Sequence, residues 1–281
     1  MKWVVLSDNR KAGSDLETEH GLCLYVETER HKLLLDTGGS EVFIQNANRL
    51  NIDLKQVDYV LISHGHSDHI GGLMHFLRLN TKARVVLSSA VQHERYFSKR
   101  DKWHDIGSDI DFETQSDRFF FVDEKPFILD DIQAFHNRST KYPFPLGNRH
   151  LFQQTSTGEM VADGFDHELI FTIGTDSLLV YTGCAHLGLQ NILSTVENQS
   201  SKPIAQVVGG FHLLSAKENE TYETETALRN MANDLQQRYP TTHFYTGHCT
   251  GDTAFETLKE VLENRLEQLH VGLKNETRIN K

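Results

Sequence analysis

The segment that most constrains this chain is residues 63–72, Ser-His-Gly-His-Ser-Asp-His-Ile-Gly-Gly. It follows an apolar run at 57–62, which predicts a buried strand, and it precedes a helical pattern. Four potential metal ligands therefore fall within six residues, and they are His64, His66, Asp68 and His69. Imidazole and carboxylate together suit zinc, iron or manganese, whereas a structural zinc site more often uses paired cysteines. The segment predicts a metal centre at the end of a strand.

The ligands of this turn divide into two pairs. A loop at a strand end can aim alternate residues one way and the next pair another way, so His64 and His66 can bind one ion while Asp68 and His69 bind a second. In two-metal sites with the ions about 3.5–4 Å apart, a bridging water loses a proton and attacks a carbonyl or phosphoryl centre. We expect two divalent metal ions, zinc first, with manganese or iron as alternatives.

Three further predicted strands end in a glycine followed by potential ligands. These ligands are Cys184 and His186 after 177–181, His212 after 205–208, and His248 after 243–246. Each signal is weak alone, but ligands of open α/β sheets bind at the carboxyl ends of the strands. Small residues also let the backbone approach a ligand. We expect these strand ends to meet the 63–72 turn at one site.

The remaining patterns predict a single domain over 1–281. Apolar residues three and four apart predict helices that include 70–79, 190–197, 224–239 and 252–270. The periodicity weakens over about 88–163, which we interpret as an insertion near the site. Within this stretch, the run Phe-Phe-Phe-Val at 119–122 fits either a strand over the site or an exposed patch for self-association, so a homo-oligomer stays open.

Charge and hydropathy limit which classes of binding partner we expect. The chain has 28 Lys plus Arg against 39 Asp plus Glu, a net charge of −11, which argues against wrapping nucleic acid. No apolar run approaches the roughly 20 residues of a membrane helix, and the start has no signal-peptide core, so we expect a cytoplasmic protein without a membrane partner. The three cysteines are far apart and odd in number, which argues against a disulfide framework. Cys23 and Cys249 are expected to be structural.

The turn at 63–72 matches the His-x-His-x-Asp-His signature of the metallo-β-lactamase superfamily, and the chain resembles that family over most of its length outside 88–163. The turn Leu-Asp-Thr-Gly at 35–38 is similar to an Asp-Thr-Gly turn of the family. The resemblance implies an α/β (α+β) fold, a four-layer αββα sandwich with the metals between two sheets. It also implies that His64 and His66 bind the first ion, while Asp68, His69 and His248 bind the second.

The chain departs from the family pattern in two places. Many members have Thr-Gly-Asp, whose Asp bridges the metals, but this chain has Thr-Gly-Cys at 182–184. Either the Cys184 thiolate replaces that carboxylate or His186 completes the first metal site. We favour His186 as a ligand and leave Cys184 open. The Pro-Gly-His-Thr element is missing, so the family motif assigns no histidine between 88 and 168.

Two residues outside these ligand sets have expected roles at the site. His212 either binds metal or polarises a substrate oxygen or phosphate. Asp36 is expected to orient a ligand histidine, because metal-bound imidazoles usually donate their other N–H to an acceptor.

Three functions are compatible with these residues. The first is a dinuclear metal-dependent hydrolase whose metal-bound hydroxide attacks a small ester, thioester, lactone or phosphodiester, with Asp68 and His212 in catalytic roles. The second follows from segments at 19–22, 182–186, 209–213 and 248–251, which are similar to a subfamily that includes a pterin-pathway synthase joining a pterin to an arylamine ribose phosphate. The third is a non-catalytic metal-binding protein. In the two enzyme hypotheses the binding partner is a small-molecule substrate, which can be phosphorylated.

Overall fold

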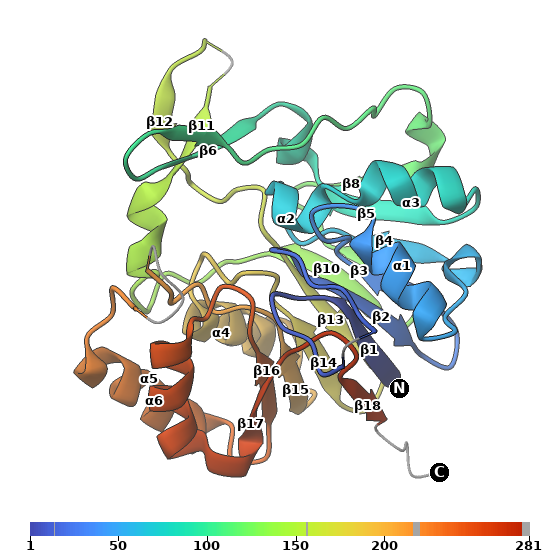
Figure 1. Ribbon diagram of the computed structural model, residues 1–281. Helices are drawn as coiled ribbons and strands as arrows, with labels where there is room; N and C mark the ends of the chain where they lie inside the picture. Colours follow the sequence, from blue (N-terminus) through green and yellow to red (C-terminus); the bar gives the residue numbers. More distant parts are fainter. Residues whose placement is uncertain (14, 156, 216–219, 277–281) are drawn as a thin grey trace.

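The computed structural model describes residues 1–13, 15–155, 157–215 and 220–276. Two large sheets form its centre (Figure 1). The first sheet has seven strands, in the order β18 (Lys274–Glu276), β1 (Lys2–Ser7), β2 (Cys23–Glu27), β3 (Lys32–Leu35), β4 (Tyr59–Leu61), β5 (Arg84–Ser88) and β8 (Phe119–Val122). From β3 to β8 neighbouring strands are parallel, so their carboxyl ends share one edge.

The second sheet also has seven strands and brings three predicted ligand loops together. Its order is β17 (Leu266–Gln268), β16 (His243–Thr246), β15 (Ile204–Val208), β14 (Leu178–Tyr181), β13 (Leu169–Ile173), β10 (Ile132–His136) and β9 (Phe127–Leu129). The strands β14 to β17 are parallel. The loops after β14, β15 and β16 therefore lie side by side at one edge.

Alternating side chains along the strands produce the layers. In β3, Leu33 and Leu35 belong to the core between the two sheets, whereas Leu34 faces the opposite side. Helices α1 (Val42–Arg49) and α3 (Leu73–Leu79) cover the outer face of the first sheet. The outer face of the second sheet is covered by α4 (Leu189–Gln199), α5 (Glu225–Arg238) and α6 (Asp252–Leu262). The expected four-layer αββα sandwich is confirmed.

The stretch 88–163 is divided between the central sheets and a separate sheet. The Phe-Phe-Phe-Val run forms β8 at the edge of the first sheet, and β9 and β10 extend the second. The rest forms a four-stranded sheet, at the top of Figure 1, in the order β12 (Met160–Ala162), β11 (Leu151–Gln154), β6 (Arg95–Lys99) and β7 (Trp103–Asp105). Short 3-10 turns lie at Leu54–Gln56, Ser89–Gln92, Ser116–Arg118, Leu146–His150 and Glu263–Arg265.

Two helix predictions differ from the structure. The helix predicted over 252–270 is wrong at its end, because α6 stops at Leu262 and Glu263 has a φ of +50°. Leu266 and Leu269 continue the helical spacing, yet both are buried beside β16. The helix predicted over 70–79 is α3 preceded by the short α2 (Ser67–Ile70). Among the described residues, no helix has the length and apolar character needed to cross a membrane.

Candidate metal centre

The turn after β4 changes backbone conformation between its two pairs of ligands. His66 is still extended and is the N-cap of α2, whereas Asp68 and His69 lie within that helix. The change turns the second pair away from the first. The rings of His64 and His69 are nevertheless 4.1 Å apart, and both side chains are fully buried. One turn therefore supplies two adjacent sets of donor atoms.

The first set of donors is completed by the loop after β14. Nε2 of His186 lies 3.4 Å from Nε2 of His64, and the ring of His186 lies 4.9 Å from that of His66. The sequence-based preference for His186 near the first pair agrees with this placement. Nε2 of His64 and Nε2 of His186 face each other, and a cation between them could bind both lone pairs.

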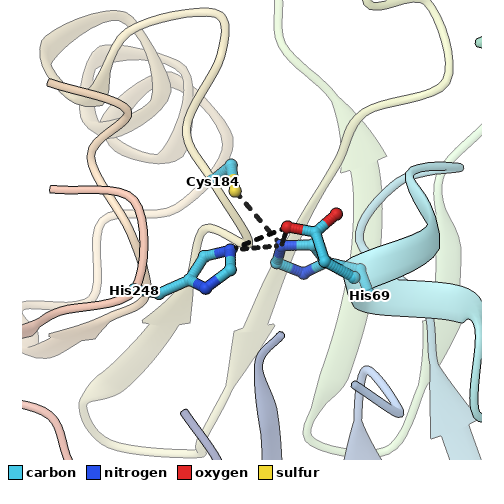
Figure 2. A group of neighbouring side chains, drawn as sticks. His69, Cys184 and His248 are labelled. Carbon is cyan, nitrogen blue, oxygen red and sulfur yellow. Dashed lines mark hydrogen bonds and ion pairs between the residues drawn. The ribbon is translucent and has the colours of Figure 1, made fainter. Parts of the chain in front are cut away.

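The second set joins both sheets. Nε2 of His248 lies 3.0 Å from Oδ2 of Asp68 and 3.1 Å from Nε2 of His69. The Sγ of Cys184 is 3.1 Å from the same His69 nitrogen. Figure 2 shows the side chains of His69, Cys184 and His248 converging from separate segments of the chain. Their ligand atoms and that of Asp68 all lie within 4.8 Å of one another.

Cys184 is common to the two sets. Besides its place beside His69 and His248, its sulfur lies within 4.8 Å of the ligand atoms of His64 and His186. A thiolate in that position can contact an ion in either set. The structure thus brings both Cys184 and His186 to the site, although the sequence presented them as alternatives.

A buried carboxylate holds the turn at 63–72, which is called the ligand turn below, in place. Asp36, which follows β3, lies 2.6 Å from Nδ1 of His69, so it has the orienting position expected for it. Its two oxygens also accept hydrogen bonds from the backbone N–H and the hydroxyl of Ser63 and from the hydroxyl of Tyr181. The whole group is buried, so these contacts hold the turn without competition from water.

A second supporting group was missed in the sequence. Oδ2 of Asp163 lies 3.4 Å from Nε2 of His66 and 3.2 Å from Nε2 of His167. The backbone N–H of Gly65 donates to Nδ1 of His167, which ties this group to the ligand turn. The only available signal was an Asp and a His four residues apart in a stretch of weak periodicity, which did not indicate that they face His66.

Tyr96 of β6 attaches the four-stranded sheet to the same group. Its ring lies 4.2 Å from that of His167 and 5.5 Å from that of His66. Gly65 leaves room for this ring, since a Cβ at that position would overlap the Tyr96 side chain. The separate sheet therefore contacts the centre directly.

Glu168 holds the loop that carries His186. Its two carboxyl oxygens accept hydrogen bonds from the backbone N–H groups of His186 and Leu187, at 2.7 and 3.0 Å. Complete burial raises the pKa of Glu168 to about 8, although these two hydrogen bonds oppose the shift. Ala185 in this loop has a φ of +55°, a conformation that costs free energy and persists because its surroundings enforce it.

The electrostatics of the cluster suit metal ions. Burial and the neighbouring imidazoles lower the pKa of His64 and of His186 well below the usual value, so both rings are neutral and offer a lone pair. Burial acts to raise the pKa of Asp68, but His69 and His248 outweigh it, and the carboxyl is ionised. Burial acts to lower the pKa of His248, yet the contact with Asp68 raises it to about 9. The cluster thus places positive charge beside Asp68, where a divalent ion would also supply it.

The side of the cluster that reaches solvent is formed by three residues. The Asp68 side chain is 19% exposed, and that of His20, which stacks on His248 with ring centroids 4.9 Å apart, is 64% exposed. His212 lies beside the first set, its ring 4.2 Å from that of His186. Its Nδ1 is buried and has no hydrogen-bond partner within the described ranges.

The donor set fits divalent transition-metal ions. It combines imidazoles, two of them held neutral, with an ionised carboxylate and a thiol, which are donors that zinc binds readily. All of the predicted ligands lie in this one cluster, and they are His64, His66, Asp68, His69, Cys184, His186 and His248.

Comparisons with known proteins agree with the fold. A family model described as the metallo-beta-lactamase superfamily matches residues 17–187. A solved structure described as a metal-dependent hydrolase of the beta-lactamase superfamily is 28% identical, with a TM-score of 0.80 and 99% of each chain covered. The 7,8-dihydropterin-6-methyl-4-(beta-D-ribofuranosyl)-aminobenzene-5'-phosphate synthase of Methanocaldococcus jannaschii is 24% identical over 96% of this chain and 94% of its own length. A metal-dependent hydrolase of Staphylococcus aureus is 29% identical over 41% of this chain and 45% of its own length.

Proposed function

Because this chain belongs to the metallo-beta-lactamase superfamily, we propose that it is a dinuclear metal-dependent hydrolase that acts on a small ester, thioester, lactone or phosphodiester. The observation that carries the proposal is the pair of donor sets that share Cys184, since a ligand within reach of both sets can hold two ions close together. The similarity to structures and proteins described as metal-dependent hydrolases supports the same reaction class.

Each residue has a proposed place in this centre. His64, His66 and His186 would hold the first ion, and Asp68, His69 and His248 the second, with Cys184 between them. Zinc is the proposed metal, because it accepts thiolate, imidazole and carboxylate together. When bound, the two ions would activate a water molecule and neutralise the negative charge that develops on the substrate.

The side chains on the open side would position the substrate. Asp68 is ionised and partly exposed, so its carboxylate can hold and orient the attacking water in addition to its role as a ligand. His212 lies beside His186, and one of its ring nitrogens lies within 4.8 Å of the sulfurs of Cys184 and Cys249. A ring in that place can hydrogen-bond to a carbonyl or phosphoryl oxygen of the substrate.

A synthase is the second candidate, and one observation favours it. The synthase of Methanocaldococcus jannaschii aligns with nearly the whole of this chain, including the segments on both sides of the centre. In that reaction the same residues would bind a phosphorylated substrate and activate a leaving group in place of water.

The test combines metal analysis with turnover. The protein is reconstituted with zinc, its ions are counted by elemental analysis, and it is incubated with a nitrophenyl phosphodiester, a thioester and a lactone. We expect two ions per chain and turnover of one bond type. His64→Ala should lose metal and turnover, whereas His75→Ala, a control on α3 with a part-exposed side chain, should keep both.

The other outcomes separate the candidates. Full metal content and turnover in the His64→Ala protein would contradict the assignment of the centre. Two ions without turnover on the panel, followed by product from a reduced pterin diphosphate and an arylamine ribose phosphate, would favour the synthase. Two ions with neither activity would favour a non-catalytic metal-binding protein.

A further inference from the structure

We infer that Cys184 and Cys249 form an intramolecular disulfide when the metal ions are absent and a two-electron oxidant of the peroxide class is present. The two Sγ atoms lie 3.2 Å apart, and both side chains are 3% exposed. Neither cysteine is in a disulfide in this structure. Cys249 was expected to be structural, but its sulfur touches the sulfur that the two donor sets share.

The sheet order explains how residues 65 positions apart come into contact. Cys184 follows β14 and Cys249 follows β16, and these two strands are separated by β15. The turn after β15 is Gly209-Gly210, which has no side chains to fill the gap. A Cβ on Gly210 would overlap the Sγ of Cys249. The two sulfurs therefore meet across a turn that only glycine leaves open.

The two thiols and one peroxide molecule are the only reactants that the disulfide needs. One thiol gives up its proton, and its thiolate attacks a peroxide oxygen. The O–O bond breaks, a sulfenic acid forms, and the hydroxide that leaves takes up that proton as water. The second thiol attacks that sulfur, the S–S bond forms, and a second water leaves. Each sulfur loses one electron, and the peroxide is reduced by two electrons.

The disulfide and the metal centre exclude each other. This part of the inference rests on the proposed function, in which Cys184 is a ligand of both ions. A sulfur bonded to Cys249 is no longer a thiolate and cannot serve as that ligand. Bound metal would in turn hold Cys184 away from the oxidant. Oxidation would thus act mainly on protein that has lost its ions.

The third cysteine provides an internal control. Cys23 lies in β2 and is buried with side chains that face α1 and α3, on the outer side of the first sheet. Cys184 and Cys249 belong to loops of the second sheet. The structure therefore pairs only one combination of the three thiols.

The experiment treats the full chain, stripped of metal by a chelator, with hydrogen peroxide and then counts free thiols after denaturation. We expect the count to fall from three to one, the mass to drop by two hydrogen atoms, and a peptide map to link Cys184 to Cys249. Dithiothreitol should restore all three thiols. A link to Cys23, or oxidation of Cys184 to a sulfinic acid without a disulfide, would overturn the inference.

Variants make the test specific. Cys249→Ser should form no disulfide, whereas Cys23→Ser should form it as the unaltered chain does. Zinc-loaded protein should keep its three thiols under the same treatment, and equal oxidation with and without zinc would overturn the exclusion. A chain that bound no zinc would refute the proposed function but would still form the disulfide, so the two failures are distinguishable.

Discussion

Asp36 and His69 are joined by a 2.6 Å contact between Oδ2 and Nδ1, and this contact fixes which nitrogen of His69 faces the second donor set. Because a carboxylate accepts, Nδ1 of His69 carries the proton and Nε2 presents its lone pair toward Cys184 and His248. The hydroxyl of Ser63 donates to the same Oδ2 and can accept from Nδ1 of His64, 2.9 Å away. Nε2 of His64 then presents its lone pair toward His186. One buried carboxylate therefore orients one histidine of each set.

Replacing Asp36 should weaken the binding of both metal ions. In Asp36→Asn the amide nitrogen cannot accept from His69 and Ser63 together, so we expect zinc affinity to fall about 10–100-fold at both sites. Competition with a chromogenic chelator measures this. Tyr181→Phe is the control, since it removes one donor to Asp36 and leaves the histidine contacts in place. An unchanged affinity in Asp36→Asn, with circular dichroism showing a folded protein, would contradict the orienting role.

Replacing Asp163 should weaken the binding of the first metal ion only. Asp163 faces His66, and the neighbouring His167 and His66 hold the pKa of its carboxyl well below the ordinary value against the effect of burial. We expect Asp163→Asn to lower the affinity of the first ion about 10-fold or more and to leave the second unchanged. Asp166→Asn, an exposed carboxyl three residues away, is the matched control. Equal losses at both ions would show a general structural effect.

Cobalt substitution tests the shared thiolate. A Co²⁺-loaded protein should show a near-ultraviolet thiolate-to-cobalt charge-transfer band. Cys184→Ser should lose the band, whereas Cys249→Ser should keep it, because only Cys184 lies within reach of both donor sets. A band that survives in Cys184→Ser would assign the metal-bound sulfur to Cys249.

A pH effect on stability is expected far from the centre, between β1 and β2. Burial acts to raise the pKa of Glu27, but hydrogen bonds from Lys2 and from the hydroxyl of Tyr25 lower it below its ordinary value of 4.5. The lowered pKa means that this carboxylate stabilises the fold above pH 4.5, and that the contribution is lost as the pH falls through the lowered pKa. Lys2 is half exposed, so solvent screening keeps the effect to about 1 kcal/mol or less.

The check for this effect is urea unfolding of Glu27→Gln and the unaltered chain, both metal-free. The variant should be less stable at neutral pH, and the difference in unfolding free energy should shrink in acid. A difference that is constant across the pH range would show that packing, not charge, is responsible.

The ligand turn and the strand ends could be predicted because each depends on local signals. A buried apolar run followed by glycine and a donor marks the carboxyl end of a parallel strand wherever it occurs, and His64, His186 and His248 were found in this way. The same apolar runs predict the buried strands of the two central sheets. No comparable signal exists for Asp163 and His167, because their importance depends on a contact with His66 about 100 residues away.

The end of α6 shows a second reason why a prediction from sequence fails. Leu262, Leu266 and Leu269 keep the three-to-four spacing of a helix face, so the pattern predicts one continuous helix. The chain reverses at Glu263, and β17 then places the later leucines against β16. Burial by an adjacent strand and burial by a helix face leave the same spacing over so few residues. Only the tertiary contact with β16 distinguishes them.

The four-stranded sheet limits how a chain of this kind can diversify. Because Tyr96 of β6 and Asp163 after β12 both contact His66, a deletion that removed this sheet would also remove two contacts of the turn at 63–72. Gene variants that alter outer positions such as Trp103, whose side chain is 42% exposed, carry no such penalty. Inheritance would therefore preserve the inner contacts of the sheet while its outer face drifts.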